Sequence, residues 1–201
     1  MKRLFFILLL TMCGMGALLF IHKSRTNEYS KEFTEETKSQ VIEKSDLYIY
    51  KSFREKELLL NGRMISPLSE ICNSDNEMSS LESEIQEDKI VLYFSEFQCE
   101  MCVDSIISQL NEVFFFDNRK LLLWVKSSNI RYVKWIEKNY GIKRDVVYRT
   151  TPNIEEQLLD IELPYFFVLE KETMRINSTF IPLKENVELT KKYLTDITAK
   201  Y

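Results

Sequence analysis

The stretch Lys89–Leu110, KIVLYFSEFQCEMCVDSIISQL, decides the fold of this chain. It holds two cysteines in a C-x-x-C spacing, Cys99 and Cys102, after a continuous apolar run at Ile90–Phe94. A short apolar run of this kind predicts a strand that is buried on both faces. We therefore expect a strand, a short turn and then a helix that begins at the cysteines. There the unpaired N–H groups and the dipole of the helix would stabilise a thiolate on Cys99.

Downstream, the chain alternates between helical and extended patterns. The expected helix after Cys102 has its apolar residues on one stripe, namely Val103, Ile106, Ile107, Leu110, Val113 and Phe114. Further strands are predicted at Leu121–Val125, Val146–Tyr148, Tyr165–Leu169 and Met174–Phe180. Further helices are predicted from Asn129 to Tyr140 with Gly141 ending it, at Asn153–Leu159 after Pro152, and at Glu185–Tyr201. This order predicts an α/β fold with a largely parallel sheet, made mixed by the final hairpin.

The region before the cysteines gives weaker signals. Asn61-Gly62, between apolar triplets in Glu57–Ile65, predicts a β-hairpin, and we expect the compact domain to start near it. Residues 66–88 are polar and predict a loop with a short helix around Met78–Ile85. Cys72 falls in this loop and is interpreted as an incidental thiol.

The N-terminus carries a candidate membrane segment. Lys2 and Arg3 precede an uncharged run at Leu4–Ile21, which at about 1.5 Å per residue is just long enough to cross a bilayer core. We expect a membrane anchor at residues 1–22, a polar juxtamembrane linker or helix at 23–56 and the folded domain at 57–201. The alternative is a signal peptide that is cleaved to release a secreted protein.

Composition excludes several function classes. The net charge is −4, with 27 basic and 31 acidic residues interspersed, so no basic surface for nucleic acid is expected. The only histidine, His22, lies at the edge of the apolar segment, so there is no Ser-His-Asp set. A zinc site would need a second pair of ligands beside Cys99 and Cys102. We therefore expect no metal and no cofactor.

The order of strand, C-x-x-C, helix, strand, helix, strand, helix, Leu-Pro, strand, hairpin partner and helix resembles the thioredoxin-like superfamily. The extra helix and strand between Leu121–Val125 and Pro164, with the leading hairpin, resemble the membrane-anchored thiol–disulfide oxidoreductases of the TlpA/ResA type. The resemblance covers residues 57–201. It implies a central mixed β-sheet flanked by helices, preceded by an N-terminal transmembrane anchor, with the domain on the extracytoplasmic side.

The resemblance also implies roles for individual residues. Cys99 matches the nucleophile and Cys102 the cysteine that resolves the mixed disulfide, so that the pair forms a redox-active disulfide. Pro164, preceded by Leu163, matches the cis-proline that offers backbone to a substrate strand. The implied partners are protein thiols and disulfides, together with an electron donor that the sequence does not identify.

Five positions around the cysteines depart from the family pattern or bear on it. Gln98 stands where the family often carries Trp, Glu100-Met101 lack the frequent Pro, and Tyr93 occupies the place of a buried acid or Asn. Glu96, the nearest acid upstream of Cys99, is then the candidate for proton transfer. Because Glu100 opposes a thiolate beside it, we expect a reducing rather than a strongly oxidising couple.

Two functions are consistent with these patterns. The first is an extracytoplasmic thiol–disulfide oxidoreductase that acts on protein disulfides, in the reducing direction. The second is a redox-inactive thioredoxin-fold binding or scaffold protein, in which Cys99 and Cys102 form a structural disulfide.

Overall fold

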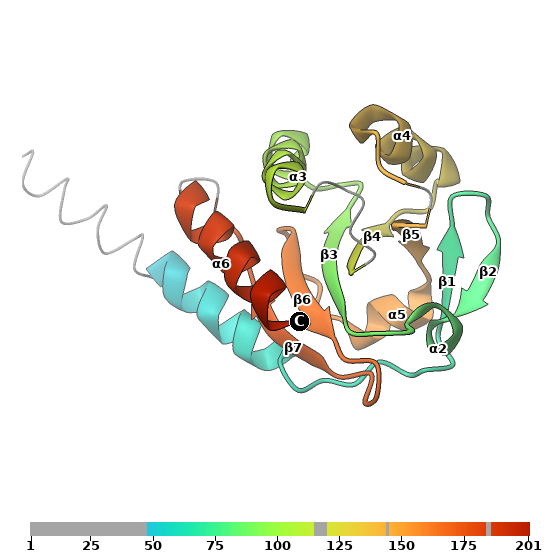
Figure 1. Ribbon diagram of the computed structural model, residues 1–201, viewed down its shortest axis with the longest axis horizontal. Coiled ribbons are helices and arrows are strands. Elements are labelled where there is room, and N and C mark those ends of the chain that lie inside the picture. The colour runs from blue at the N-terminus through green and yellow to red at the C-terminus, as the bar shows by residue number, and fades with distance from the viewer. Residues whose placement is uncertain (1–47, 115–119, 144, 184–185) are drawn as a thin grey trace, which may run out of the picture. The chain divides into compact units, whose positions relative to one another are not determined.

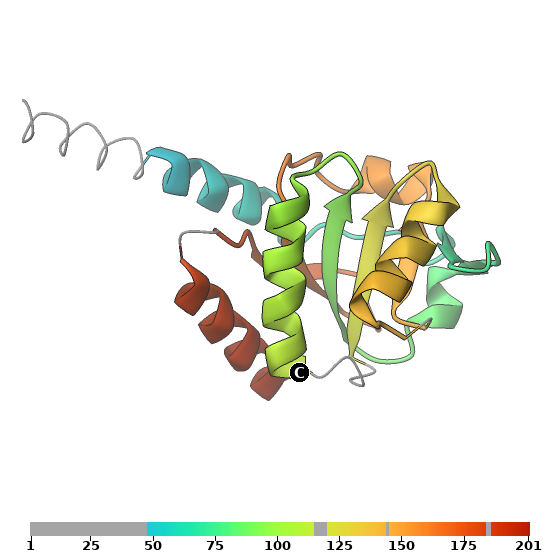
Figure 2. The same ribbon diagram turned by 90° about the horizontal axis from the view of Figure 1, so that it is seen from above.

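The computed structural model describes residues 48–114, 120–143, 145–183 and 186–201. The compact unit Phe53–Tyr201 contains a seven-stranded mixed sheet with the strand order β2-β1-β5-β4-β3-β6-β7 among these residues. Helices α3 and α4 lie on one side of the sheet and α5 on the other (Figures 1 and 2). This arrangement confirms the predicted α/β fold with a central mixed sheet between helices. The sheet is not largely parallel as predicted, because among the described strands β3–β4 and β4–β5 pair in parallel and the other four pairs are antiparallel.

The elements follow one another in the predicted order from the cysteine motif onward. The strands are β1 (Glu70–Asn73), β2 (Met78–Ser80), β3 (Lys89–Ser95), β4 (Leu121–Lys126), β5 (Val147–Thr150), β6 (Tyr165–Leu169) and β7 (Ile176–Phe180). The helices are α2 (Leu81–Glu84), α3 (Glu100–Phe114), α4 (Ile130–Tyr140), α5 (Pro152–Gln157) and α6 (Val187–Lys200). Residues 48–60 are also helical, and the compact unit begins within that helix.

Strand β3 lies in the interior of the sheet, between β4 and β6, and is buried on both faces. It pairs in parallel with β4 and antiparallel with β6. Its side chains alternate: Ile90, Leu92 and Phe94 join one hydrophobic cluster, while Val91 and Tyr93 join the other. Each large apolar side chain buried in this way contributes about 1.5–3 kcal/mol relative to an exposed one. The strand that leads to the cysteines is therefore held firmly in place.

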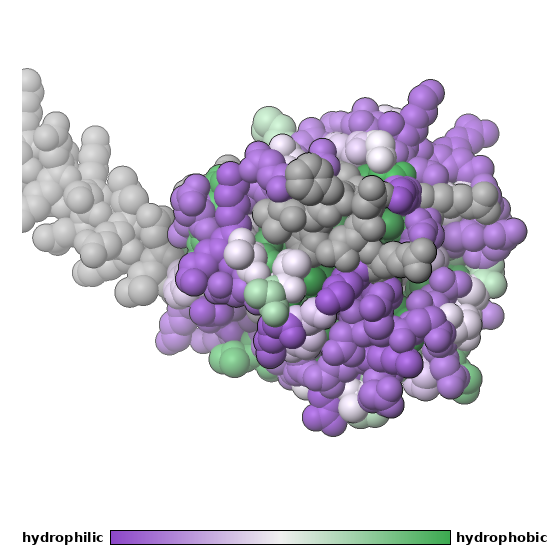
Figure 3. Space-filling model, in the orientation of Figure 1, coloured by the Kyte–Doolittle hydropathy of each residue, from purple (hydrophilic) through white to green (hydrophobic). Residues whose placement is uncertain are grey.

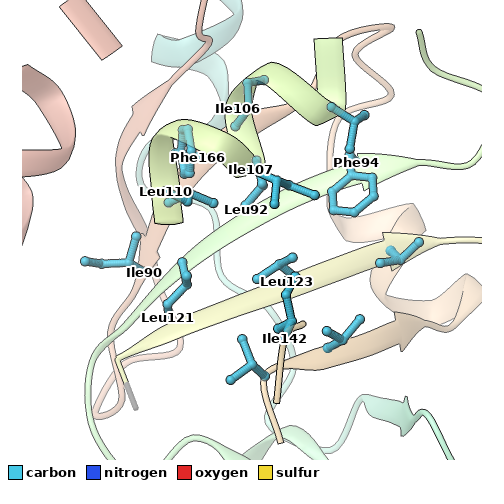
Figure 4. Packing of buried hydrophobic residues seen from close by; sticks show 14 of the residues in the cluster. Ile90, Leu92, Phe94, Ile106, Ile107, Leu110, Leu121, Leu123, Ile142 and Phe166 are labelled. Atoms are coloured by element: carbon cyan, nitrogen blue, oxygen red, sulfur yellow. The ribbon is translucent and has the colours of Figure 1, made fainter. Parts of the chain in front are cut away.

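The two clusters bind different helices to the sheet. The first takes its helical residues from α3, α4 and α6, and Figure 4 shows Ile106, Ile107 and Leu110 of α3 facing the side chains of β3 and β4. The second includes Ile154 of α5, Leu81 of α2 and Leu60 of the helix at residues 48–60. These contacts confirm the apolar stripe predicted for α3 from Val103 to Leu110, whereas the side chains of Val113 and Phe114 lie outside the described residues.

The predicted start and end of α4 are confirmed by its caps. The Asn129 side chain accepts a hydrogen bond from the Arg131 N–H, which satisfies one of the first free N–H groups of the helix. Gly141 ends the helix in the left-handed conformation at φ 63°, which a residue without a Cβ adopts at little cost.

The hairpin predicted at Glu57–Ile65 is wrong. Residues 48–60 form a helix, and the Asn61 N–H donates to the Glu57 carbonyl as its last turn closes. Gly62, at φ 86°, then redirects the chain, and its N–H donates to the Ile176 carbonyl at 2.7 Å. Asn-Gly favours positive φ, and this preference serves the end of a helix as well as a hairpin turn.

The region before β3 also contains a hairpin that was not predicted. Strands β1 and β2 pair antiparallel, and β1 continues the sheet by pairing antiparallel with β5. The short helix predicted around Met78–Ile85 is reduced to α2, because β2 occupies its first residues. These strands are too short, at three and four residues, to show a clear alternation.

None of the helices within the described ranges is long and apolar enough to cross a membrane. The predicted anchor at residues 4–21 lies outside those ranges, as does most of the predicted linker.

Candidate functional site

The cysteine motif lies at the junction between β3 and α3. Strand β3 ends at Ser95 and α3 begins at Glu100, so Cys99 directly precedes the first helical residue. The Cys99 carbonyl accepts hydrogen bonds from the N–H groups of Cys102 and Val103 at 3.0 and 3.2 Å. Cys99 is exposed and Cys102 is half-buried. The predicted placement is confirmed: both cysteines stand at the N-terminus of α3, beyond the carboxyl end of a central strand.

A tight turn connects Ser95 to Cys99. The Gln98 N–H donates to the Ser95 carbonyl at 3.1 Å, and the Phe97 N–H donates to the Ser95 Oγ at 3.3 Å. Ser95 is the last residue of β3, and its neighbour Glu96 donates its N–H to the Lys126 carbonyl at the end of β4. The turn that carries Cys99 is thus bonded directly to the buried sheet.

The segment that contains Leu163 and Pro164 meets the motif at the same edge of the sheet. Tyr165, which starts β6, lies opposite Tyr93 of β3 in the antiparallel register. The Gln98 Nε2 donates to the Ile161 carbonyl at 3.1 Å, which links the motif turn to the chain just before Leu163. The structure therefore brings the predicted substrate-binding segment to the edge where the cysteines lie.

The side chains of Leu163 and Pro164 are both partly or fully buried. Leu163 is half-buried and packs against the second hydrophobic cluster, and Pro164 is buried. No cis peptide bond occurs among the described residues, so the Leu163–Pro164 bond is trans. The cis bond predicted at Pro164 is therefore wrong. The trans form is the commoner state of an X-Pro bond, favoured by about 0.5–1 kcal/mol.

Glu96 faces the loop that precedes α4. Its carboxylate accepts hydrogen bonds from the Ser127 Oγ at 2.7 Å and from the Ser128 N–H at 3.2 Å. These bonds fix the end of β3 to the loop after β4. Glu96, which was predicted to transfer a proton, therefore lies at the edge of the sheet that carries the cysteines. Its hydrogen bonds give it a structural role there.

Tyr93 occupies the position of the buried acid in the resembled family. It is almost fully buried, with its ring centroid 5.1 Å from that of Tyr165. Burial raises the pKa of Tyr93 well above its usual value, and the carboxylates of Glu155 and Asp160 raise it further. The side chain is therefore neutral at physiological pH, and this position supplies no carboxylate.

Two large apolar side chains stand exposed beside the cysteines. Phe97 is 85% exposed and Met101 is 79% exposed, and they lie on either side of Cys99 in the chain. The surface in Figure 3 is mainly hydrophilic, with hydrophobic residues scattered over it. Sequence reasoning did not assign these two residues to the site, although their position next to the motif was a signal that could have done so.

Helix α4 brings aromatic side chains close to the acidic residues around the motif. The Tyr140 hydroxyl donates to the Asp104 carboxylate of α3, and the Trp135 ring stacks on Tyr132 with centroids 5.7 Å apart. Burial raises the pKa of Tyr132, and the neighbouring charges of Glu100, Glu96 and Asp104 raise it further. The edge of the sheet that carries the cysteines is therefore rich in negative charge.

The remaining described cysteine lies elsewhere. Cys72 is buried in β1, and its Sγ lies 3.5 Å from the Asn76 Oδ1. Within the described ranges, no group of three or more His, Cys, Asp or Glu side chains is arranged to hold a metal ion.

Comparison with known proteins supports the fold. No family model and no curated protein matches the chain. Among solved structures, a candidate electron transfer protein from Aquifex aeolicus VF5 matches with a TM-score of 0.51 and 15% identity, over 67% of this chain and 92% of that one. A thiol:disulfide interchange protein of the thioredoxin family from Chlorobium tepidum TLS matches with a TM-score of 0.46 and 16% identity, over 67% and 95%. A secreted Mycobacterium tuberculosis disulfide oxidoreductase homologous to E. coli DsbE matches with 0.47 and 7%, over 64% and 96%.

At 15% identity, the likeness to the Aquifex aeolicus structure with a TM-score of 0.51 is evidence of a shared fold alone. Together with the strand order and the β3–α3 junction, this likeness supports the thioredoxin-like fold that the sequence predicted.

Proposed function

We propose that this protein is a thiol–disulfide oxidoreductase that reduces protein disulfides through Cys99 and Cys102. The observation that carries the proposal is the placement of an exposed Cys99 directly before α3, with Cys102 in the first turn of the same helix. The N-terminus of a helix favours a thiolate through its N–H groups and dipole. An exposed thiolate in such a place can reach a disulfide on another protein.

The reaction proceeds by two exchanges. The Cys99 thiolate attacks one sulfur of the substrate disulfide, which breaks the S–S bond, forms a mixed disulfide and releases the first substrate thiolate. Cys102 then loses its proton and attacks the Cys99 Sγ, which forms the Cys99–Cys102 disulfide and releases the second thiolate. Two electrons pass to the substrate, the released thiolates take protons from water, and an external dithiol must reduce the pair again.

The exposure of the two cysteines supports this division of roles. Cys99 is exposed and is therefore assigned as the nucleophile, while the half-buried Cys102 is placed to attack from within the helix. Leu163 and Pro164, at the same edge, offer backbone to an extended substrate segment. Phe97 and Met101 offer apolar surface on either side of Cys99.

The charge of Glu100 beside the pair favours the reducing direction. Glu100 is exposed and directly follows Cys99, so its carboxylate opposes accumulation of the thiolate. Strong oxidants of this fold owe their potential to a highly stabilised thiolate. We therefore assign a reducing couple.

The proposed location of the protein is extracytoplasmic, with residues 4–21 as the membrane anchor or as a cleaved signal.

The test is turnover of insulin disulfides with dithiothreitol as the donor, together with the reduction potential of the Cys99/Cys102 couple. We expect turnover that falls to the uncatalysed rate in Cys99→Ser, because a hydroxyl does not ionise at neutral pH. The potential should lie nearer to about −270 mV than to about −120 mV, the values of a reducing and a strongly oxidising couple of this fold.

Two results would contradict the proposal. An undiminished rate in a folded Cys99→Ser variant would remove Cys99 as the nucleophile. A wild-type protein without turnover, whose Cys99–Cys102 disulfide resists dithiothreitol, would favour the scaffold function with a structural disulfide.

A further inference from the structure

Gln98, the residue directly before Cys99, uses both ends of its amide to join two parts of the site. Its Oε1 accepts a hydrogen bond from the Ser95 N–H at 3.2 Å, and its Nε2 donates to the Ile161 carbonyl at 3.1 Å. Its own backbone N–H also donates to the Ser95 carbonyl at 3.1 Å. The side chain therefore spans from the last residue of β3 to the segment that leads into Leu163.

The bridge forms where the backbone ladder between β3 and β6 ends. The last backbone pair of these strands is Tyr93 with Tyr165. Two residues further along β3, Ser95 lies beyond the last paired residue of β6. The Glu96 N–H points to the opposite side and bonds to β4, so the Ser95 N–H is directed toward β6. The Gln98 amide therefore acts as an additional rung that extends the ladder beyond its last backbone pair.

The position of this rung affects both halves of a disulfide exchange. Gln98 adjoins Cys99 in the chain, so fixing its side chain fixes the backbone from which the thiol projects. Ile161 lies two residues before Leu163, so fixing its carbonyl restrains the backbone offered to a substrate. A second link across the same gap, the ion pair of Lys126 with Asp160 at 3.5 Å, is exposed at the Asp160 end and contributes little.

We propose that Gln98 is a positioning residue, whose amide sets the separation between the Cys99 nucleophile and the Leu163–Pro164 segment that aligns a protein substrate. The inference rests on the proposed function, because it assigns a task within that exchange. A small disulfide needs only the thiolate, whereas a protein disulfide needs the thiolate and the aligned backbone together. Loss of the bridge should therefore affect the two kinds of substrate differently.

The first experiment compares Gln98→Met with the wild type on two substrates, insulin and hydroxyethyl disulfide. Met has a similar length but makes no amide hydrogen bonds. We expect kcat/KM for insulin to fall about tenfold, as for the loss of one or two hydrogen bonds, while the value for hydroxyethyl disulfide changes less than about twofold. Gln86→Met is the matched control, because the Gln86 amide bonds within its own segment, to the Glu82 and Ser83 carbonyls.

The second experiment uses Gln98→Glu and follows the pH dependence of insulin reduction as a ratio to the wild type. An ionised carboxylate keeps the acceptor for Ser95 but cannot donate to Ile161, whereas a protonated one can do both. A charge at position 98 also opposes the Cys99 thiolate, so the ratio is compared on both substrates. It should rise more for insulin than for hydroxyethyl disulfide as the pH falls from 7 to about 5, while the ratio for Gln98→Met stays flat. The charged and titratable groups around this position are Glu96, Cys99, Glu100, Lys126, Asp160 and Glu162, and both variants share them.

The outcomes separate the two claims. A wild type that reduces neither substrate, or a Cys99→Ser variant that still reduces both, contradicts the proposed function. With an active wild type, an equal loss on both substrates in a folded Gln98→Met variant overturns the positioning role, as does an unchanged rate on insulin. A pH ratio for Gln98→Glu that does not rise more for insulin than for hydroxyethyl disulfide also overturns it. Circular dichroism and thermal unfolding establish that each variant is folded.

Discussion

Strands β1 and β3 are each associated with a cysteine, and the two thiols differ in their exposure to solvent. Cys99 follows the central strand β3 and is exposed at the start of a helix, whereas Cys72 lies within the outer strand β1 and is 0% exposed. The Cys72 Sγ lies 3.6 Å from the Asn73 carbonyl oxygen and 3.5 Å from the Asn76 Oδ1, inside its own hairpin. A cysteine within a strand becomes part of the core, while one just beyond a strand becomes available for chemistry.

The difference also lies in how the two regions are supported. Strand β3 has neighbours on both sides and hydrophobic clusters on both faces, so the turn that follows it starts from a rigid base. Strand β1 joins the sheet through β5 and carries only the three-residue β2 on its other side. Reactive groups are best placed on rigid elements, and the central strand offers the more rigid one.

The largest expected difference is in alkylation of the two thiols. In the native protein, iodoacetamide should modify Cys99 at least about a thousandfold faster than Cys72, because Cys72 becomes accessible only when the structure opens. Peptide mapping by mass spectrometry assigns each rate to its cysteine and keeps Cys13 and Cys102 separate. In concentrated guanidinium chloride the rates should converge. Similar rates in the native state would show that β1 opens readily. They would contradict the difference in accessibility between Cys99 and Cys72.

The second difference should appear within one stretch, between Phe94 and Phe97. Phe94 is fully buried in β3, and Phe97 is 85% exposed in the turn. Phe94→Ala should lower the free energy of unfolding by about 3–5 kcal/mol. Phe97→Ala should change it by less than about 0.5 kcal/mol.

The catalytic activity, in contrast, should depend more on Phe97 than on Phe94. Loss of the Phe97 ring should lower kcat/KM for insulin about fivefold, as for the loss of roughly 1 kcal/mol of apolar burial against a protein substrate. Urea unfolding and steady-state kinetics measure the two effects. A stable Phe97→Ala variant with unchanged kinetics would show that exposure beside the cysteines does not contribute to binding.

The sequence was sufficient to predict the part of the fold that bears on chemistry. Strands β3, β4 and β6 are continuous apolar runs, and α3 and α4 have a helical stripe, so hydrophobic periodicity alone located them. The caps of α4 were equally local, since Asn129 and Gly141 act within a few residues of themselves. Where a signal lay within a single element, the prediction was confirmed.

Predictions failed where distant residues decide the structure. Asn61-Gly62 has the same local preference at a helix end as in a hairpin, and its bond to Ile176 selects the former. Strand β1 is defined by its pairing with β5, which lies far along the chain. The Gln98 bridge joins residues 63 positions apart, so the sequence showed Gln98 only as a departure from a pattern.

The smallest expected effect concerns the carboxylate of Glu96, which was predicted to transfer a proton. Its matched partner in the β1–β2 hairpin is Glu77, whose Oε2 accepts a hydrogen bond from the Asn73 Nδ2 at 2.8 Å. Substitution of either by Gln keeps an acceptor oxygen but removes the ionisable carboxyl group that could gain and lose a proton. The comparison therefore separates a contribution to structure from a contribution to chemistry.

We expect Glu96→Gln to lower kcat for insulin reduction about threefold and Glu77→Gln to leave it unchanged. The loss lies below the usual range of general acid–base catalysis, because the Glu96 carboxylate also binds Ser127 and Ser128 and does not act on the proton alone. The pH profile of kcat is the decisive measurement. A profile of unchanged shape in Glu96→Gln, with a loss no larger than that of Glu77→Gln, would restrict Glu96 to holding the end of β3 against the loop before α4.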